Sequence, residues 1–203
     1  MPDIIIPNTN GTMSTYEETY REFLDDRILV LNEGIDECVI ENYIMYILKW
    51  NKEDAHLPVE NRKKIRMFVS SRGGDVFSSN IMIDVITQSK TPIVGIGLDL
   101  VASSAYCLFL ACHERYAFEN TSFLQHEGEV TIENSRSKFR QTALFFEDME
   151  KRSKDFILSR TKMTEEFYDK MYEQELWFFA DSAVEYGVID GIIGKDVELT
   201  DIL

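Results

Sequence analysis

Residues 93–112 of this 203-residue chain read IVGIGLDLVASSAYCLFLAC. The first six are apolar at both odd and even positions, which is typical of a strand buried on both faces of a sheet. Residues 102–112 carry no charge and predict a buried helix. A short turn is expected between the two, with Ser103 and Ser104 at the start of the helix. This segment predicts a strand–turn–helix unit inside an α/β core.

The same alternation of strands and helices continues in both directions. Strands are expected at 27–31, 65–69, 115–118, 122–126 and 188–193. Helices are expected at 14–24, 36–50, 76–88, 134–160 and 164–174, with a short one ending at Gly187. Ser14 and Glu17 have the spacing of a capping box, and residues 51–62 predict a polar loop. No Pro/Gly/Ser-rich linker divides the chain, so a single α/β domain is expected.

Composition excludes several function classes. The chain has 21 basic and 36 acidic residues, a net charge of −15, which argues against a nucleic-acid partner. The longest uncharged stretch, residues 100–112, is too short to span a membrane, and the N-terminus does not resemble a signal peptide. Cys38, Cys107 and Cys112 lack the spacing of a metal site and fit a reducing compartment. These features predict a soluble, cytoplasmic protein.

Ser103 and Ser104 allow two interpretations. A serine at a helix N-terminus lies beside free backbone N–H groups, which could stabilise an oxyanion if the serine were a nucleophile. Most serines in this position simply cap the helix, and spacing alone favours that interpretation. The turn at residues 72–74 (RGG) also follows a strand, and its glycines would let backbone N–H groups approach a ligand closely.

A serine nucleophile needs a base, and the chain has three histidines. His56 lies in the polar loop, and His113 follows the buried helix, where a structural role is favoured. His126 ends the strand predicted at 122–126. Its position makes it the best candidate for a catalytic base.

Four stretches resemble, in the same order, motifs of one protease family. Residues 71–76 (SRGGDV) are similar to its Ser-Pro-Gly-Gly turn, and residues 101–105 (VASSA) to its Ala-Ala-Ser-Met-Gly nucleophile motif. Residues 120–126 (NTSFLQH) are similar to Asn-Ser-Arg-(Ile/Val)-Met-Ile-His, and residues 183–190 (AVEYGVID) to Ala-Val-Glu-Tyr-Gly-Leu-Val-Asp. The family is ClpP, the proteolytic subunit of the ATP-dependent Clp protease, and the resemblance spans residues 16–193 in the manner of a divergent member.

The resemblance implies a role for five residues. Ser103 would attack the peptide carbonyl, and His126 would carry its proton to the leaving amine. The backbone N–H groups of Gly74 and Ser104 would form the oxyanion hole. The family's third catalytic residue is an aspartate before an aromatic strand, and counting back from the 183–190 motif assigns its position to Glu175.

The chain also departs from the family pattern. Glu175 is one methylene longer than aspartate, which is compatible with a triad but predicts a slower enzyme. Arg72 replaces a proline, and Ser104-Ala105 replaces Met-Gly. Residues 127–132 lack most of the glycines found in the family, where this segment pairs rings and borders the substrate groove. The family's ring contacts and cleavage preference are therefore not carried over to this chain.

The resemblance further implies a crotonase-related α/β fold of repeated β-β-α units with a projecting handle helix at 134–160. The head would comprise residues 16–133 and 161–203, and residues 1–15 would line an axial pore. Such subunits form heptameric rings that stack into a tetradecamer, and a ClpX- or ClpC-like AAA+ unfoldase feeds them unfolded proteins. That partner hydrolyses ATP, and this chain has no G-x-x-x-x-G-K-[ST] loop. No metal or other cofactor is expected.

Three alternatives remain open. The altered third residue and glycine turn fit a non-catalytic ring subunit, although Ser103 and His126 are both present. A crotonase-type acyl-CoA enzyme would use backbone oxyanion donors without a nucleophilic serine. A relative of the signal-peptide-peptidase type would use a Ser–Lys pair and would not need His126.

Overall fold

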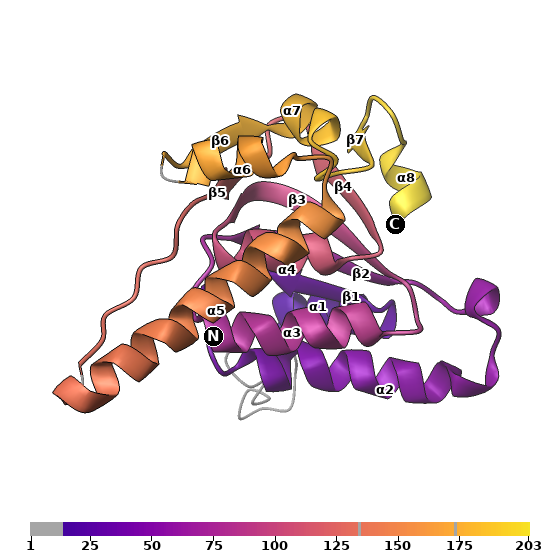
Figure 1. Cartoon of the computed structure of the whole chain (residues 1–203). Coiled ribbons are helices and arrows are strands. Elements are labelled where there is room, and N and C mark those ends of the chain that lie inside the picture. Colours follow the sequence, from indigo (N-terminus) through magenta and orange to yellow (C-terminus); the bar gives the residue numbers. More distant parts are fainter. Residues whose placement is uncertain (1–13, 134, 173) are drawn as a thin grey trace.

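The protein was analysed as a computed structural model, which describes residues 14–133, 135–172 and 174–203. Within these residues the centre of the molecule is a seven-stranded sheet (Figure 1). Its main path has the order β1-β2-β3-β4-β7, and every neighbouring pair on this path is parallel. These strands are β1 (Ile28–Leu31), β2 (Ile65–Ser71), β3 (Ile93–Ala102), β4 (Glu114–Phe118) and β7 (Gly191–Ile193).

The sheet divides along β3. Val94–Gly97 pair with β4, whereas Leu100–Ala102 pair in parallel with β5 (Ser122–Gln125). The buried Thr121 donates its hydroxyl to the carbonyls of Gly97 and Leu98, at 3.0 and 2.9 Å, where the two pairings separate. The antiparallel strand β6 (Leu176–Phe179) completes this branch on the far side of β5. One strand thus joins the main sheet to the branch that carries residues 123–126.

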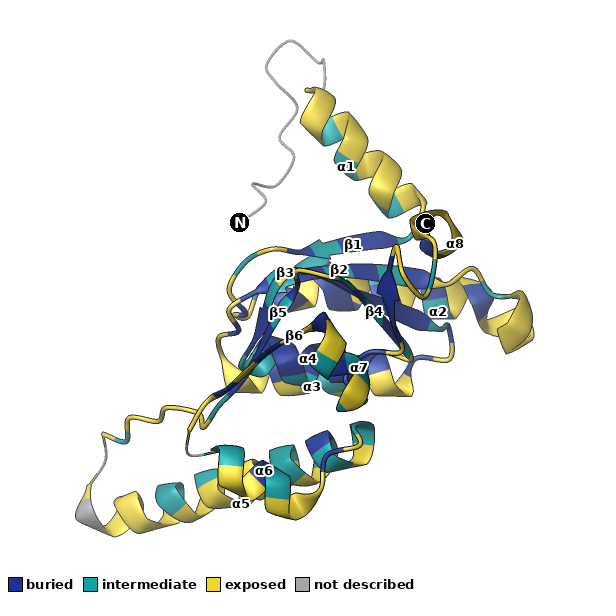
Figure 2. Ribbon diagram, turned by 90° about the horizontal axis from the view of Figure 1, so that it is seen from above, coloured by how far each residue is buried: buried dark blue, intermediate teal, exposed yellow. Residues whose placement is uncertain are grey.

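Helices lie around this sheet. α2 (Met45–Glu53), α3 (Val76–Gln88) and α4 (Ser104–Ala111) lie on one face, and α5 (Arg136–Arg160) crosses over α4 and extends beyond it (Figure 1). α1 (Thr15–Asp25) projects beside β1, on the opposite side of the sheet from α5 and α6 (Glu165–Tyr172) (Figure 2). The short helices α7 (Ala180–Glu185) and α8 (Leu199–Ile202) follow near the C-terminus. The long late helix is the projecting element that the sequence predicts.

Aromatic packing fixes α4 against the β5–β6 branch. Phe123 of β5 stacks on Phe178 of β6 with ring centroids 5.3 Å apart, and its ring lies 5.8 Å from that of Phe109 in α4. Phe109 and Phe123 are fully buried, and burying each ring contributes about 1.5–3 kcal/mol relative to leaving it exposed. This cluster holds the end of β5 and the start of β6 at a fixed distance from α4.

The structure confirms the α/β fold and most of the predicted elements. The helix predicted at 76–88 is α3, and Ser14 and Glu17 form the predicted capping box at the start of α1. Of the axial segment predicted for residues 1–15, only residues 14–15 are among the described residues. The division of the chain into that segment, a head and a handle stays a prediction.

Several predicted boundaries are wrong. The turn expected before Ser103 is absent because residues 100–102 pair with β5, so that β3 continues to Ala102. The expected loop at 51–62 contains the end of α2 and two short 3-10 turns, and the helix expected at 36–50 begins with a π-helical turn at Ile40–Ile44. At 188–193, only Gly191–Ile193 pair with β4. α8 was not predicted.

Candidate active site

Ser103 joins β3 to α4 in a strained backbone conformation. Its φ is 57° and its ψ is −129°, a sparsely populated combination that costs a non-glycine residue about 1–3 kcal/mol. The Ser103 N–H donates to the carbonyl of Leu124 in β5 at 2.9 Å, and its side chain makes no capping hydrogen bond to α4. The simple interpretation of Ser103 as a helix cap is therefore wrong. A serine on a strained strand-to-helix turn is instead typical of a nucleophile.

The Gly73-Gly74 turn packs directly against Ser103, and both positions require glycine. Gly73 has a φ of 89°, and a Cβ atom there would lie 2.8 Å from Cβ of Ser103. A Cβ atom on Gly74 would lie 2.2 Å from the carbonyl oxygen of Ile35. The Ile35 N–H donates to the Gly73 carbonyl at 3.0 Å, which fixes the turn from its other side.

Ser104 carries one of the two backbone N–H groups that the family resemblance assigns to the oxyanion hole. The Gly74 N–H donates to Ser104 Oγ at 2.8 Å, and the Ser104 hydroxyl donates back to the Gly74 carbonyl at 3.2 Å. The Ser104 N–H lies in the first turn of α4, where backbone amides have no intrahelical acceptor. The two predicted oxyanion donors therefore belong to adjoining turns, but one of them is already hydrogen-bonded.

His126 and Glu175 face each other across the ends of β5 and β6. The antiparallel register pairs Gln125 with Leu176, which places the next residue of β5 opposite the residue before β6. His126 Nδ1 lies 4.0 Å from Glu175 Oε1, which is too long for a direct hydrogen bond. Glu175 has a φ of 57°, its side chain is 57% exposed, and its Oε2 accepts from the Trp177 indole N–H at 3.1 Å. The two residues are close together but in a loose geometry, and the catalytic role predicted for Glu175 stays a prediction.

The other candidate groups lie outside this arrangement. His56 is exposed, and His113 Nδ1 accepts a hydrogen bond from the Ile93 N–H at 3.1 Å. Burial lowers the pKa of His113, in agreement with the structural role predicted for it. Burial also raises the pKa of the Cys107 thiol to about 11 and that of Cys112 to about 12. These thiols stay protonated near neutral pH and are not candidate nucleophiles.

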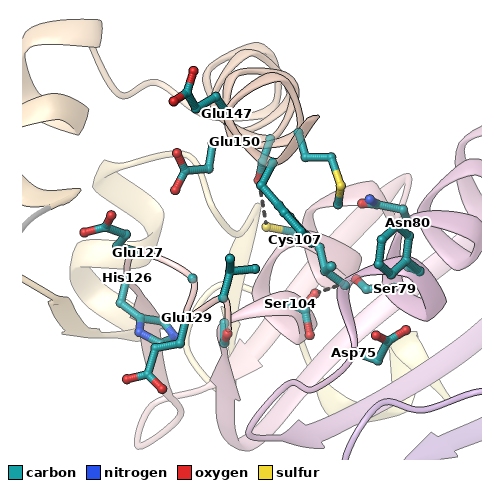
Figure 3. Close-up of a pocket in the computed structure, with 18 of the residues that line it drawn as sticks. Asp75, Ser79, Asn80, Ser104, Cys107, His126, Glu127, Glu129, Glu147 and Glu150 are labelled. Carbon is teal, nitrogen blue, oxygen red and sulfur yellow. Dashed lines mark hydrogen bonds between the residues drawn. The ribbon is translucent and has the colours of Figure 1, made fainter. Parts of the chain in front are cut away.

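A cleft of about 700 Å³ connects these residues. Ser103, Ser104, Gly74 and His126 line it, together with residues 127–132 and the inner side of α5. Figure 3 shows Glu147 and Glu150 extending from α5 on the same side of the cleft as His126 and Glu127. The Ser103 hydroxyl makes no hydrogen bond within the described part of the chain. The cleft thus gathers four of the five predicted site residues, while Glu175 is outside its lining and lies 4.0 Å from His126.

Sequence reasoning missed much of the cleft lining, including Gln125, Glu150 and Tyr172. Gln125 is the last residue of the strand β5, and Glu150 and Tyr172 lie on separate helices, α5 and α6. No local pattern connects them, because they come from three different elements, and Glu150 and Tyr172 are in contact only through the hydrogen bond between α5 and α6. Residues 14–133, 135–172 and 174–203 contain neither a cluster of metal-ligating side chains nor a helix long and apolar enough to cross a bilayer.

Comparisons with known proteins identify the family of the chain. Residues 11–196 match the family described as Clp protease. The chain is 28% identical over 182 residues to ATP-dependent Clp protease proteolytic subunit 2 of Treponema pallidum, covering 89% of this chain and 88% of the relative. It is 26% identical over 180 residues to the protein of the same name from Tropheryma whipplei, covering 88% and 97%.

The fold has a close counterpart among solved structures. A ClpP1 mutant from Listeria monocytogenes superposes with a TM-score of 0.76 at 20% sequence identity, covering 91% of this chain and 99% of that one. This likeness supports the fold, and the match over residues 11–196 supports the family. The chain therefore belongs to the Clp protease family.

Proposed function

We propose that this chain is a serine endopeptidase subunit of a self-compartmentalised, ATP-dependent protease, with Ser103 as the nucleophile. The observation that carries the proposal is the strained Ser103 turn, whose N–H is bonded to β5, the strand that ends next to His126. Ser103 and His126 line the same cleft. Membership of the Clp protease family supports the same chemistry.

In the proposed mechanism, Ser103 Oγ attacks the peptide carbonyl while His126 accepts its proton. His126 then donates this proton to the leaving amine, and water hydrolyses the acyl-enzyme in a second, equivalent step. Glu175 faces Nδ1 of His126, which leaves Nε2 for the serine, and its charge would stabilise the imidazolium. Apo geometries are often loose and tighten when substrate binds, so the 4.0 Å separation is compatible with this role.

The proposed oxyanion hole consists of the N–H groups of Gly74 and Ser104. To receive a carbonyl oxygen, the Gly74 N–H must first exchange its bond to Ser104 Oγ for one to the substrate. The Ser104 hydroxyl therefore competes with the substrate for this donor. The competition is an expected source of slow turnover, in addition to the longer Glu175 side chain.

We extend the proposal to the assembly that the family implies. Stacked heptameric rings would enclose the clefts, with α5 as the contact between rings, and a ClpX- or ClpC-like AAA+ unfoldase would hydrolyse ATP and deliver unfolded proteins in the cytoplasm. Phe139, Leu144 and Phe145 of α5 are exposed apolar side chains, which suits a helix that packs against another subunit. The native mass of the purified protein tests this assembly.

A second candidate is a non-catalytic ring subunit of the same fold. The bond between Gly74 N–H and Ser104 Oγ and the exposed position of Glu175 favour it. A Ser–Lys mechanism has less support, because no lysine is among the described residues that line the cleft.

A fluorophosphonate probe separates the two candidates. With the peptidase, the probe is expected to form an adduct on Ser103 in the assembled protein, located by peptide mass spectrometry. The adduct should disappear in Ser103→Ala and persist in Ser159→Ala, which changes an exposed serine of α5 outside the cleft. An unlabelled Ser103 in correctly assembled rings would show a non-catalytic subunit.

Ser104→Ala is expected to increase peptidase activity. The substitution removes the acceptor that holds the Gly74 N–H and leaves the backbone N–H of residue 104 in place. A freed oxyanion donor should raise kcat several-fold, which is less than the roughly 10²–10³-fold that the complete loss of one such donor costs. The measurement is kcat for a fluorogenic peptide, with Ser78→Ala in α3 as the control. A loss of activity in Ser104→Ala would show that its hydroxyl assists the reaction.

A further inference from the structure

Gln125, the last residue of β5, has a buried acceptor without a partner. The residue is 3% exposed, and its Oε1 makes no hydrogen bond among the described residues. Alternation along the strand places Gln125 on the same face as Phe123, which packs against Phe109 of α4. Gln125 also lines the cleft beside Ser103. A buried acceptor left unpaired is unfavourable, so this amide suits a ligand that brings a donor.

Negatively charged side chains line the same cleft. Glu150 of α5 accepts a hydrogen bond from the Tyr172 hydroxyl at 2.9 Å, which fixes its carboxylate at the cleft. Burial and the nearby charges of Glu150 and Glu127 raise the pKa of Tyr172, so the phenol remains a donor. Three further carboxylates line the cleft, those of Asp75, Glu129 and Glu147.

No arginine or lysine balances these carboxylates among the described residues of the cleft. Lys154, a nearby cation of α5, is paired with Glu165 at 2.9 Å and Asp169 at 2.6 Å instead. His126 is the one group of the described lining that can carry positive charge. The cleft therefore has a negative potential that favours a cationic ligand.

We propose that the cleft holds a subsite for a lysine or arginine side chain, at the residue whose carbonyl Ser103 attacks. The inference rests on the proposed peptidase function and deepens it. Ammonium and guanidinium groups have only donors, which match the Gln125 acceptor and the Glu150 carboxylate. Their aliphatic stems can pack along Phe146, Met149 and Ile157, which line the same cleft. An apolar side chain would leave Gln125 unpaired, and an acidic one would meet several carboxylates.

Matched peptides test this subsite. Fluorogenic substrates that differ only in the residue before the cleaved bond should give a kcat/KM about tenfold or more higher for lysine and arginine than for norleucine, given the strength of hydrogen bonds to charged groups. Norleucine keeps the aliphatic stem of lysine without the charge. Glutamate at this position should be the poorest substrate. Equal rates for lysine and norleucine would overturn the proposal.

Substitutions locate the preference in the cleft. Glu150→Gln and Gln125→Leu should each lower the lysine-to-norleucine ratio several-fold. Asp155→Asn makes the same change of charge as Glu150→Gln, at an exposed position of α5 outside the cleft, and should leave the ratio unchanged. A ratio that persists in both cleft variants, or that falls equally in Asp155→Asn, would show that the general charge of the protein sets the preference.

A binding measurement separates failure of the subsite from failure of the peptidase. Calorimetry on the Ser103→Ala protein compares uncleaved peptides that carry lysine or norleucine. Tighter binding of the lysine peptide, lost in Ser103→Ala/Glu150→Gln, supports the subsite even if the wild-type protein hydrolyses nothing and Ser103 is not labelled. Equal binding overturns the subsite even if Ser103 is labelled and active.

Discussion

His126→Ala is expected to lower the kcat/KM of peptide hydrolysis about 10⁴-fold or more, because the variant loses the group that removes the proton from Ser103. Glu175→Gln should have a smaller effect and lower kcat/KM by roughly tenfold or more, since the acid of a triad acts through the histidine. Glu175 lies 4.0 Å from His126 Nδ1 and its side chain is largely exposed. Solvent therefore shares with Glu175 the role of stabilising the imidazolium. Initial rates at saturating and at limiting peptide concentrations give kcat and kcat/KM.

A control and two contrary outcomes test the roles assigned to His126 and Glu175. His56→Ala removes an exposed histidine outside the cleft and should leave activity unchanged. Retention of activity in His126→Ala would assign the base to another residue. A loss in Glu175→Gln as large as that in His126→Ala would show that the carboxylate moves into direct contact with the imidazole during catalysis.

Of the substitutions proposed for this protein, Asp54→Ala is expected to cause the largest loss of stability. The Arg27 guanidinium binds both carboxylate oxygens of Asp54, at 2.5 and 2.9 Å, and both side chains are nearly buried. The Thr91 hydroxyl also donates to Asp54 at 3.1 Å. Removing the carboxylate takes from the Thr91 hydroxyl its acceptor and leaves the Arg27 guanidinium with only the Lys63 carbonyl, at 3.0 Å, and the more distant carboxylate of Glu53, at 3.8 Å. Breaking a nearly buried ion pair in this way should lower the free energy of unfolding by up to about 3–5 kcal/mol. Urea unfolding at a fixed protein concentration measures the difference.

The effect of Asp54→Ala should depend on pH. The hydrogen bond from Arg27 holds the pKa of Asp54 below its ordinary value, so the pair contributes fully above the unfolded-state pKa of about 3.9. As the pH falls through the lower folded-state pKa, that contribution is lost. The difference in stability between the wild type and Asp54→Ala should therefore shrink in acid.

An exposed ion pair provides the matched control. Lys63 and Asp26 lie 2.7 Å apart, with side chains 49% and 65% exposed. Asp26→Ala should have a much smaller effect, which high salt should reduce further. Equal losses of unfolding free energy in Asp26→Ala and Asp54→Ala would show that burial of the Arg27–Asp54 pair adds nothing to stability.

The sequence predicted the centre of the fold because residues 93–112 combine a two-sided apolar strand with an uncharged helix. Each property is local and follows directly from burial. Glu175 could be placed beside His126 because it lies a fixed number of residues before a well-matched motif. The end of β3 was mispredicted because residues 100–102 are held by pairing with β5, which is remote in sequence.

Other features of the site depend on contacts between distant segments. Ser104 binds Gly74 only because the glycine turn packs against residues 102–104. No sequence propensity of serine predicts such a contact. The unpaired acceptor of Gln125 likewise depends on how α4, which is remote in sequence from the end of β5, packs against this strand. The strain at Ser103 became visible only in the backbone angles.

Because the sheet divides along β3, substitutions that change the cleft wall can be separated during evolution from substitutions that move the catalytic residues. Ser103 and His126 are attached to one hydrogen-bonded ladder, through the end of β3 and through β5. Much of the wall of the cleft, including Glu150, instead comes from residues 127–132, α5 and α6, which are outside that ladder. Substitutions there can alter which side chains the cleft accepts without moving the proposed nucleophile from its base. Descendants of such a chain could diversify their substrates and inherit the chemistry unchanged.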